Sequence, residues 1–316
     1  MSELLGIGYI CIDHYIRCTD ASRRFDGSAK ASATELTQAV GGSVPRILIA
    51  ASATSQHRAT FIGGARNTDA AWLESQLVSA SVTPRLVQSD TTGRAFIEFR
   101  PDGQFSRIVT IESPWQPSAD TIRAVAHIRD ITDVVIDGRY PSVAETVLET
   151  LEESTGVRPT VWMDPGSTAL ASSERQRLAL GALKLADVVI APTAFIAGAS
   201  SLIESDLRTK LTLLVETCDD GSIRIFGRFG LIHVTSPPVT VKGSTLGAGD
   251  VFRGRLLAHL AGRDLVELTS SDAEAAAKAS LAASAWRLRD ESLLPVAPGH
   301  EVSMSPITAR RRVVLK

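Results

Sequence analysis

A run of small residues followed by an acid stands in the last third of the sequence, Ser244-Thr245-Leu246-Gly247-Ala248-Gly249-Asp250. Glycine and alanine at 247–249 permit a tight turn whose backbone N–H groups stay uncovered. A helical pattern follows directly at 251–261, so the positive end of a helix dipole adds to these N–H groups. The segment therefore predicts an anion-binding cradle with Gly247, Ala248 and Gly249 as its donors.

Asp250 falls in the first turn of the predicted helix, where the dipole favours an ionised carboxylate. Such a carboxylate could accept the proton of a hydroxyl group that attacks a phosphoryl group. Phosphoryl transfer depends mainly on positioning and charge neutralisation, so a base beside a nest of amides is a sufficient core for it. A simpler interpretation stays open, in which residues 247–249 form an ordinary tight loop and Asp250 caps the helix.

The elements that would position these residues alternate along the chain. Predicted strands lie at Leu4–Ile12, Thr60–Gly63, Asp133–Asp137, Thr160–Asp164, Asp187–Ala191 and Leu211–Glu216. Helical patterns such as Ser142–Glu153 separate them, and a long alanine-rich helix is predicted at Ala273–Leu288. Buried strands joined by crossover helices indicate a mostly parallel sheet covered on both faces.

Two segments depart from this alternation. Residues 92–112 predict two strands around a Pro101-Asp102-Gly103 turn, and the polar residues 17–38 carry no strong core pattern. Length alone permits two domains or one large domain with a small appendage. With lid segments at about 14–40 and 92–112, residues 1–316 fit one domain plus a lid better than two equal domains. An antiparallel flap cannot bury both of its faces alone, so it should cover a site, a partner subunit or both. A surface hairpin without such a role is the alternative.

The composition excludes several classes of protein. The formal net charge is −2, whereas nucleic-acid binding relies on clustered Lys and Arg, so we expect no nucleic-acid partner. No segment approaches about 18 uninterrupted apolar residues, so we expect no membrane span. The three cysteines show no metal-like spacing, and no charged-then-apolar leader precedes them, which favours a reducing cytoplasm.

Residues 245–252, Thr-Leu-Gly-Ala-Gly-Asp-Val-Phe, closely resemble the Asp-Thr-x-Gly-Ala-Gly-Asp motif of the ribokinase, or PfkB, family of carbohydrate kinases. Asp13 resembles the family Asp that binds sugar hydroxyls, Gly41-Gly42 the di-glycine of the sugar site, and Thr92-Gly93 the start of the lid. Within the family, Ile136-Asp137-Gly138-Arg139 is most similar to the ketohexokinase and sulfofructose kinase branch. The resemblance implies an α/β, ribokinase-like three-layer sandwich with a central mostly parallel sheet and a small β lid.

The resemblance also implies an activity. The chain would transfer the γ-phosphate of ATP, with Mg2+, to a hydroxyl of a sugar or sugar-acid, with Asp250 as general base, and would form a homodimer through the lid. The implied substrate-binding residues are Asp13, Gly41, Gly42, Arg46 and Arg139. The implied nucleotide-binding residues are Thr217, Gly221, Thr245, Ala279 and Ser280. The usual Asn-x-x-Glu motif is replaced by Thr193 to Ile196, so Asp219 and Asp220 are the candidates for the metal.

Arg46 stands where the family usually has Asn. A guanidinium in a sugar pocket costs desolvation unless an anion meets it, so we hypothesise an acidic acceptor contacted by Arg46 and Arg139. Alternatively, Arg46 points to solvent or pairs with a protein carboxylate. Two other functions also stay open: a non-catalytic sugar or nucleotide sensor, and a nucleoside kinase, which an aromatic clamp in the acceptor pocket would indicate.

Overall fold

The computed structural model describes residues 2–18, 33–54, 56–100, 105–112, 115–128, 130–166, 169, 171–199, 211–236, 239–241 and 245–289. The predicted Pro101-Asp102-Gly103 turn and Ser244 lie outside these residues, as do residues 19–32 of the predicted lid.

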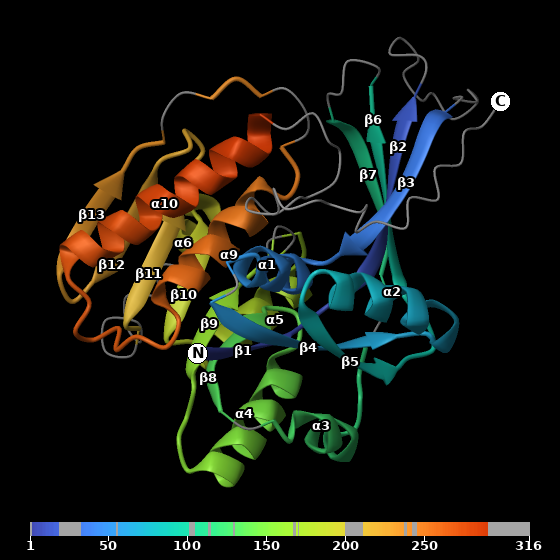
Figure 1. Cartoon of the computed structure of the whole chain (residues 1–316), viewed down its shortest axis with the longest axis horizontal. Helices are drawn as coiled ribbons and strands as arrows, with labels where there is room; N and C mark the ends of the chain where they lie inside the picture. Colours follow the sequence, from blue (N-terminus) through green and yellow to red (C-terminus); the bar gives the residue numbers. More distant parts are fainter. Residues whose placement is uncertain are drawn as a thin grey trace.

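A nine-stranded sheet forms the centre of the molecule (Figure 1). Its strands, in spatial order, are β13 (Gly230–Val234), β12 (Ile223–Gly227), β11 (Leu213–Thr217), β10 (Val188–Pro192), β9 (Thr160–Asp164), β8 (Ile131–Asp137), β1 (Ser2–Ile7), β4 (His57–Ala65) and β5 (Val82–Gln88). The strands from β11 to β5 run parallel, and β12 and β13 form an antiparallel hairpin at one edge. The predicted mostly parallel sheet is confirmed.

Helices cover both faces of this sheet and make two separate hydrophobic cores. One core contains side chains of α1 (Ser43–Ser52), α2 (Asn67–Ser79), α9 (Ala248–Leu260) and α10 (Ser270–Arg289). The other contains side chains of α3 (Ala119–Ala126), α4 (Pro141–Thr155), α5 (Ser173–Leu183) and α6 (Thr193–Gly198). Successive strand residues point to opposite faces, so Leu4 lies in the first core and Leu5 in the second.

A second, four-stranded sheet stands beside the first (Figure 1). Its order is β3 (Ala33–Gly41), β2 (Cys11–Cys18), β6 (Gly93–Phe99) and β7 (Phe105–Ile111). We call it the small sheet. Five of its side chains, Tyr15, Ala39, Ala95, Ile97 and Phe99, form a core of their own. Together with the two helical layers, the two sheets confirm the predicted fold class.

The predicted single strand Leu4–Ile12 is wrong. The backbone leaves the central sheet after Ile7 and enters the small sheet at Cys11. Between them, the N–H of Tyr9 donates to the side chain of Asp137 at 3.4 Å, which ends the pairing of β1 with β8. Asp13 therefore lies inside β2 of the small sheet and not at the end of the first core strand.

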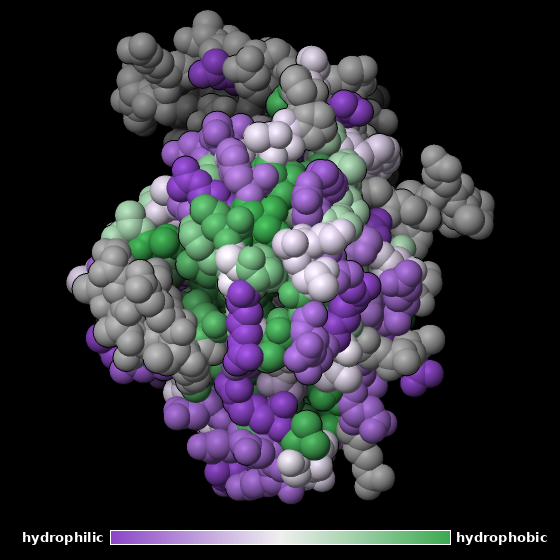
Figure 2. Space-filling model, turned by 90° about the vertical axis from the view of Figure 1, so that its left-hand side faces the viewer, coloured by the Kyte–Doolittle hydropathy of each residue, from purple (hydrophilic) through white to green (hydrophobic). Residues whose placement is uncertain are grey.

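Figure 2 views the molecule from the side on which β13 lies in Figure 1. Apolar side chains gather in the middle of this face and hydrophilic ones surround them. Phe226 and Leu231, which face each other across β12 and β13, are 38% and 59% exposed at this edge. Among the helices in the described ranges, none combines the length and the apolar character that crossing a membrane requires.

Candidate active site

Helix α9 begins at the predicted anion cradle. Gly247 precedes it with φ 80° and ψ −8°, a left-handed conformation that glycine adopts without strain. The N–H of Ala248 donates to the carbonyl of Thr245 at 3.3 Å, so this predicted donor has a partner within the turn. The N–H groups of Gly249 and Asp250 belong to the first helical turn, whose amides have no carbonyl partner within the helix. These two amides are the best-placed donors for an anion.

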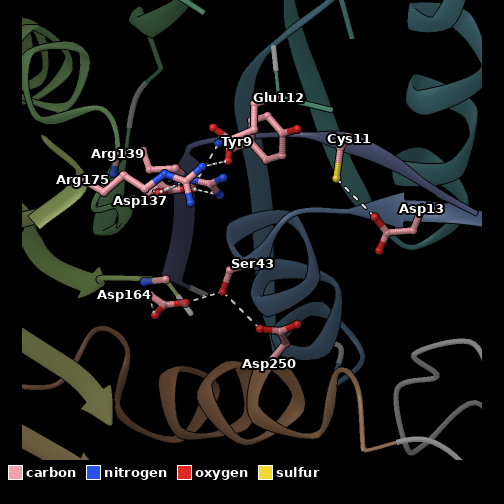
Figure 3. Close-up of polar contacts among 11 residues, drawn as sticks. Tyr9, Cys11, Asp13, Ser43, Glu112, Asp137, Arg139, Asp164, Arg175 and Asp250 are labelled. Atoms are coloured by element: carbon pink, nitrogen blue, oxygen red, sulfur yellow. Dashed lines mark hydrogen bonds and ion pairs between the residues drawn. The ribbon is translucent and has the colours of Figure 1, made fainter. Parts of the chain in front are cut away.

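The Asp250 carboxylate sits in a cluster of buried polar side chains (Figure 3). The hydroxyl of Ser43 lies 3.1 Å from Oδ1 of Asp250 and also hydrogen-bonds to Asp164. The guanidinium of Arg253 lies 3.7 Å from both carboxylates. Burial raises the pKa of Asp250, and the Asp164 charge raises it further, whereas Arg46 and Arg253 lower it. The fold thus holds Asp250 less acidic than an exposed aspartate, as a general base requires.

The ends of parallel strands and the starts of helices bring this cluster together. Asp164 is the last residue of β9, and Ser43 is the first residue of α1. Gly42 connects β3 to α1 with φ 100° and ψ 142°, and a Cβ there would overlap the carbonyl oxygen of Tyr9. Glycine is therefore required at 42 for Ser43 to reach the cluster. Functional groups at the carboxyl ends of parallel strands are typical of α/β folds.

Arg46 lies one helical turn after Ser43 and joins the small sheet to α1 and α9. Its Nη2 donates to Asp13 and to the hydroxyl of Tyr15, the latter at 2.6 Å, and its Nε donates to the Val40 carbonyl at 3.3 Å. Its Nη1 lies 3.7 Å from Asp250. Arg46 is only 11% exposed, and its carboxylate neighbours hold its pKa above the ordinary value despite its burial. Of the predicted alternatives, the structure shows pairing with protein carboxylates.

Asp13 has room for its carboxylate because Gly41 has no side chain. A Cβ at Gly41 would overlap Oδ1 of Asp13 and lie 2.5 Å from the sulfur of Cys11. The Cys11 thiol donates to the same oxygen at 3.2 Å. Burial and the Asp13 charge raise the pKa of Cys11, so its sulfur stays protonated and serves as a donor. Asp13, Gly41, Gly42 and Arg46 are thus neighbours in space.

Arg139 stands slightly apart from this group. Its backbone N–H, Nε and Nη2 all donate to the Asp137 carboxylate, at 2.7 to 3.2 Å. The guanidinium carbon lies 4.3 Å from the centre of the Tyr9 ring, within the range of a cation–π contact. Asp137 is the strand partner of Asp164, so this pair borders the Asp250 cluster.

No protein-family model and no curated protein matches the sequence. Solved structures match almost its whole length. A fructokinase from Xylella fastidiosa with bound ATP has a TM-score of 0.71 at 16% identity, over 91% of this chain and 92% of that one. A ribokinase from Thermotoga maritima has a TM-score of 0.68 at 18% identity, over 92% and 94%. The chain has the ribokinase-like fold. A nucleoside kinase from Methanocaldococcus jannaschii shares it, with a TM-score of 0.68 at 15% identity over 93% and 95%.

In this ribokinase-like fold the predicted nucleotide-binding residues lie on three elements. Thr217 ends β11, and Gly221 has φ 79° in the hairpin turn that leads to β12. Thr245 is exposed just before the cradle. On α10, Ala279 is exposed, whereas Ser280 is fully buried and donates its hydroxyl to the Ala276 carbonyl at 2.7 Å. The structure therefore turns the Ser280 side chain into the helix packing.

Helix α10 also contacts the start of α9, where the anion cradle lies. The hydroxyl of Ser284 donates to the carbonyl of Ala248, the first residue of α9, at 3.0 Å. Ala279 is five residues before Ser284 on the same helix, so it lies between one and two turns from this contact. The alanine-rich helix and the anion cradle thus form one unit.

The predicted metal ligands Asp219 and Asp220 are both exposed in the turn between β11 and β12. Hydrogen bonds from Ser222, including its N–H at 2.8 Å, lower the pKa of Asp220. Within the described residues, no three His, Cys, Asp or Glu side chains form a group that could hold a metal ion. Mg2+ in kinases is usually held by one or two carboxylates together with substrate phosphates, and ionised aspartates fit that donor chemistry.

Three residues of the site were not predicted from the sequence: Ser43, Asp164 and Arg253. Each carried a local signal. Ser43 directly follows the glycine pair, Asp164 ends a predicted buried strand, and Arg253 comes three residues after Asp250 on the same helix. Only the fold shows that all three converge on one carboxylate.

Proposed function

We propose that the chain is an ATP-dependent kinase that phosphorylates a hydroxyl group of a sugar or sugar-acid. The observation that carries this proposal is Asp250, a buried carboxylate in the first turn of α9, beside the uncovered amides and with a raised pKa. Structures named as ribokinase and fructokinase share the fold, and one of them contains ATP, which supports the same activity.

In the proposed reaction, Asp250 accepts the proton of the acceptor hydroxyl while the oxygen of that hydroxyl attacks the γ-phosphorus of ATP. The phosphorus–oxygen bond to ADP breaks as the new ester bond forms. The first-turn amides of Gly249 and Asp250, with the α9 dipole, stabilise the negative charge on the transferred group. Mg2+, when bound with ATP, would neutralise phosphate charge, and Asp219 and Asp220 are its proposed ligands.

The proposed acceptor site uses Asp13, Gly41, Gly42 and Arg46. The Asp13 carboxylate would accept hydrogen bonds from sugar hydroxyls, and Gly41 leaves it the space to do so. Arg46 pairs with Asp13 and lowers the pKa of Asp250, so it favours the ionised form of the base against the effect of burial. An acidic acceptor would have to compete with Asp13 for Arg46, and with Asp137 for Arg139.

ATP would lie between the Thr217–Gly221 turn and α10 near Ala279, with Thr245 at the cradle. The contact of Ser284 with Ala248 supports this position, because it fixes α10 next to the proposed phosphate site. Ser280 would act only through the packing of α10, since its hydroxyl is committed to Ala276.

The deciding experiment is an ADP-release assay with pooled neutral sugars, sugar acids and nucleosides. Release with a sugar or sugar-acid pool, lost in Asp250→Asn, supports the proposal. Ligand-induced thermal stabilisation without ADP release would instead indicate a non-catalytic sensor. Release only with nucleosides would indicate a nucleoside kinase.

We further propose a homodimer through the small sheet. β7 is an edge strand of that sheet, and it exposes Ile108, Val109 and Ile111 by 41%, 43% and 56%. Exposed apolar edge strands usually pair or are covered. Light scattering after gel filtration should give twice the chain mass, and Ile111→Glu should give the monomer. A monomeric unmodified chain would refute this part.

A further inference from the structure

A cavity of about 570 Å3 lies beside the proposed acceptor site. Its walls include three aromatic residues, Tyr9, Trp115 and Tyr140, and five charged ones, Glu112, Arg139, Glu174, Arg175 and Arg177. Asp13, Arg46 and Asp250 are not among its lining residues. Ligand pockets of about 300–1,000 Å3 bury molecules of drug size. The cavity therefore holds more than one sugar ring would fill, and Arg139 is the one residue of its lining that is also among the proposed substrate-binding residues.

Two of its walls border the reaction site. Tyr9 follows the last residues of β1, and its carbonyl packs directly against Gly42, the residue before Ser43. Arg139 is held by Asp137, whose strand partner is Asp164. Figure 3 shows the Tyr9, Arg139 and Arg175 side chains next to the Ser43–Asp164–Asp250 cluster. The cavity thus borders the elements that carry the Ser43–Asp164–Asp250 cluster.

The aromatic rings in the lining are not arranged as a parallel clamp. The Trp115 and Tyr140 rings lie 5.4 Å apart at 77° to each other, and Arg139 covers the Tyr9 ring at 4.3 Å. A flat base is best held between parallel faces. Trp115 is only 4% exposed, so Tyr140 supplies more of the aromatic surface that a ligand can reach. One accessible aromatic face suits the C–H face of a saturated sugar ring.

Three of the five charged lining residues are in ion pairs, whereas Glu174 and Arg177 are exposed. Arg139 is neutralised by Asp137, and Arg175 forms an ion pair with Glu112 across the gap between α5 and the end of β7. An anionic ligand group that bound Arg139 or Arg175 would have to break one of these pairs. Hydroxyl groups can bind without breaking an ion pair, because each hydroxyl both donates and accepts hydrogen bonds and so fits beside the paired Arg and Glu side chains.

We propose that this cavity binds a second sugar ring, so that the acceptor is a glycoside or an oligosaccharide of at least two rings. This inference rests on the proposed kinase function. One ring presents its hydroxyl to Asp250, and the next ring packs on Tyr140 with its hydroxyls on Glu112 and Arg175.

The test compares kcat/KM for hexoses and pentoses with that for disaccharides that contain the same rings. Because the second ring adds aromatic contacts, we expect the matching disaccharide to be preferred by at least about tenfold. Tyr140→Ala should reduce the ratio of the two kcat/KM values to near one. Tyr140→Phe is the matched control, because it keeps the ring and removes only the hydroxyl, and it should keep the preference.

Three results would overturn the inference while the kinase function stands: a preferred monosaccharide, an unchanged ratio in Tyr140→Ala, or a nucleoside preferred over every disaccharide. Thermal shifts separate the two proposals if no ADP forms. A disaccharide that stabilises the unmodified protein but not Tyr140→Ala would support the cavity assignment and refute only the kinase function. Stabilisation by monosaccharides alone would refute the cavity assignment.

Discussion

The hydroxyl of Ser43 lies within hydrogen-bonding distance of both Asp164 and Asp250. A serine hydroxyl has a single hydrogen and can donate it to one carboxylate at a time. Both contacts can therefore be hydrogen bonds at the same time only if Asp164 or Asp250 is protonated and donates to the Ser43 oxygen. The raised pKa of Asp250 agrees with this arrangement, because burial and the Asp164 charge both disfavour a second ionised carboxylate.

Asp164→Asn should therefore move the acid limb of the kcat/KM profile to lower pH. The substitution removes a negative charge that raises the pKa of Asp250, so the base stays ionised in more acidic solution. A pH–rate profile of purified protein measures this. Asp120→Asn, on the exposed start of α3, is the matched control and should not move the limb. An unchanged limb, or one moved to higher pH, would contradict the coupling.

Asp250→Asn should lower turnover by at least about a hundredfold, the usual contribution of a positioned base. It should also raise the melting temperature at neutral pH. The folded-state pKa of Asp250 is above its ordinary value, so its contribution to stability is complete only below that ordinary value and is lost as the pH rises through the folded-state pKa. Removing the charge therefore increases the stability of the folded protein at neutral pH and not in strong acid. A variant with near-normal turnover would discard Asp250 as the base.

Arg46→Met should destabilise the protein by about 3–5 kcal/mol, because it leaves the buried Asp13 carboxylate without its cation. Urea unfolding monitored by circular dichroism measures this loss. The double variant Arg46→Met/Asp13→Asn should recover most of it, since the unpaired charge is then absent. If the double variant is no more stable than Arg46→Met, the loss comes from packing and not from the ion pair.

Gly42→Ala should cost about 3 kcal/mol or more, because backbone strain and an overlap with the Tyr9 carbonyl add together. Gly156→Ala provides the control. Gly156 also has a positive φ, of 69°, but a Cβ there meets no atom within 4 Å, so its replacement should cost only about 1 kcal/mol. Unfolding curves of both variants give the comparison. Equal losses would show that the contact with Tyr9 contributes nothing.

Much of the fold could be predicted from local patterns. Buried strands such as Thr160–Asp164 and the alanine-rich helix α10 have apolar residues on defined faces, and they appear where they were expected. β5 was missed because only one of its seven residues is buried and Pro84 interrupts it. The β12–β13 hairpin was missed for a similar reason, since in β13 only Val234 is buried and in β12 only Ile223 and Ile225 are.

The candidate site was predictable only where neighbouring residues define it. Gly247, Gly249 and Asp250 are adjacent in the chain, so their spacing alone predicts the cradle and the base. Ser43 is 121 residues from Asp164 and 207 from Asp250, and no periodicity connects positions so far apart. The partner of Arg46 depended in the same way on how the small sheet meets α1.

Between β1 of the central sheet and β2 of the small sheet, the chain runs through only three residues, Gly8 to Ile10. Tyr9 lies in this short connection and contacts both sheets. Its hydroxyl donates to the carbonyl of Ile111 in the small sheet at 3.3 Å, and its backbone N–H donates to the Asp137 side chain in the central sheet. Any rotation of the small sheet would swing Asp13 and the Tyr9 ring together relative to Asp250. The orientation of the small sheet therefore affects both the position of the acceptor relative to Asp250 and the shape of the neighbouring cavity.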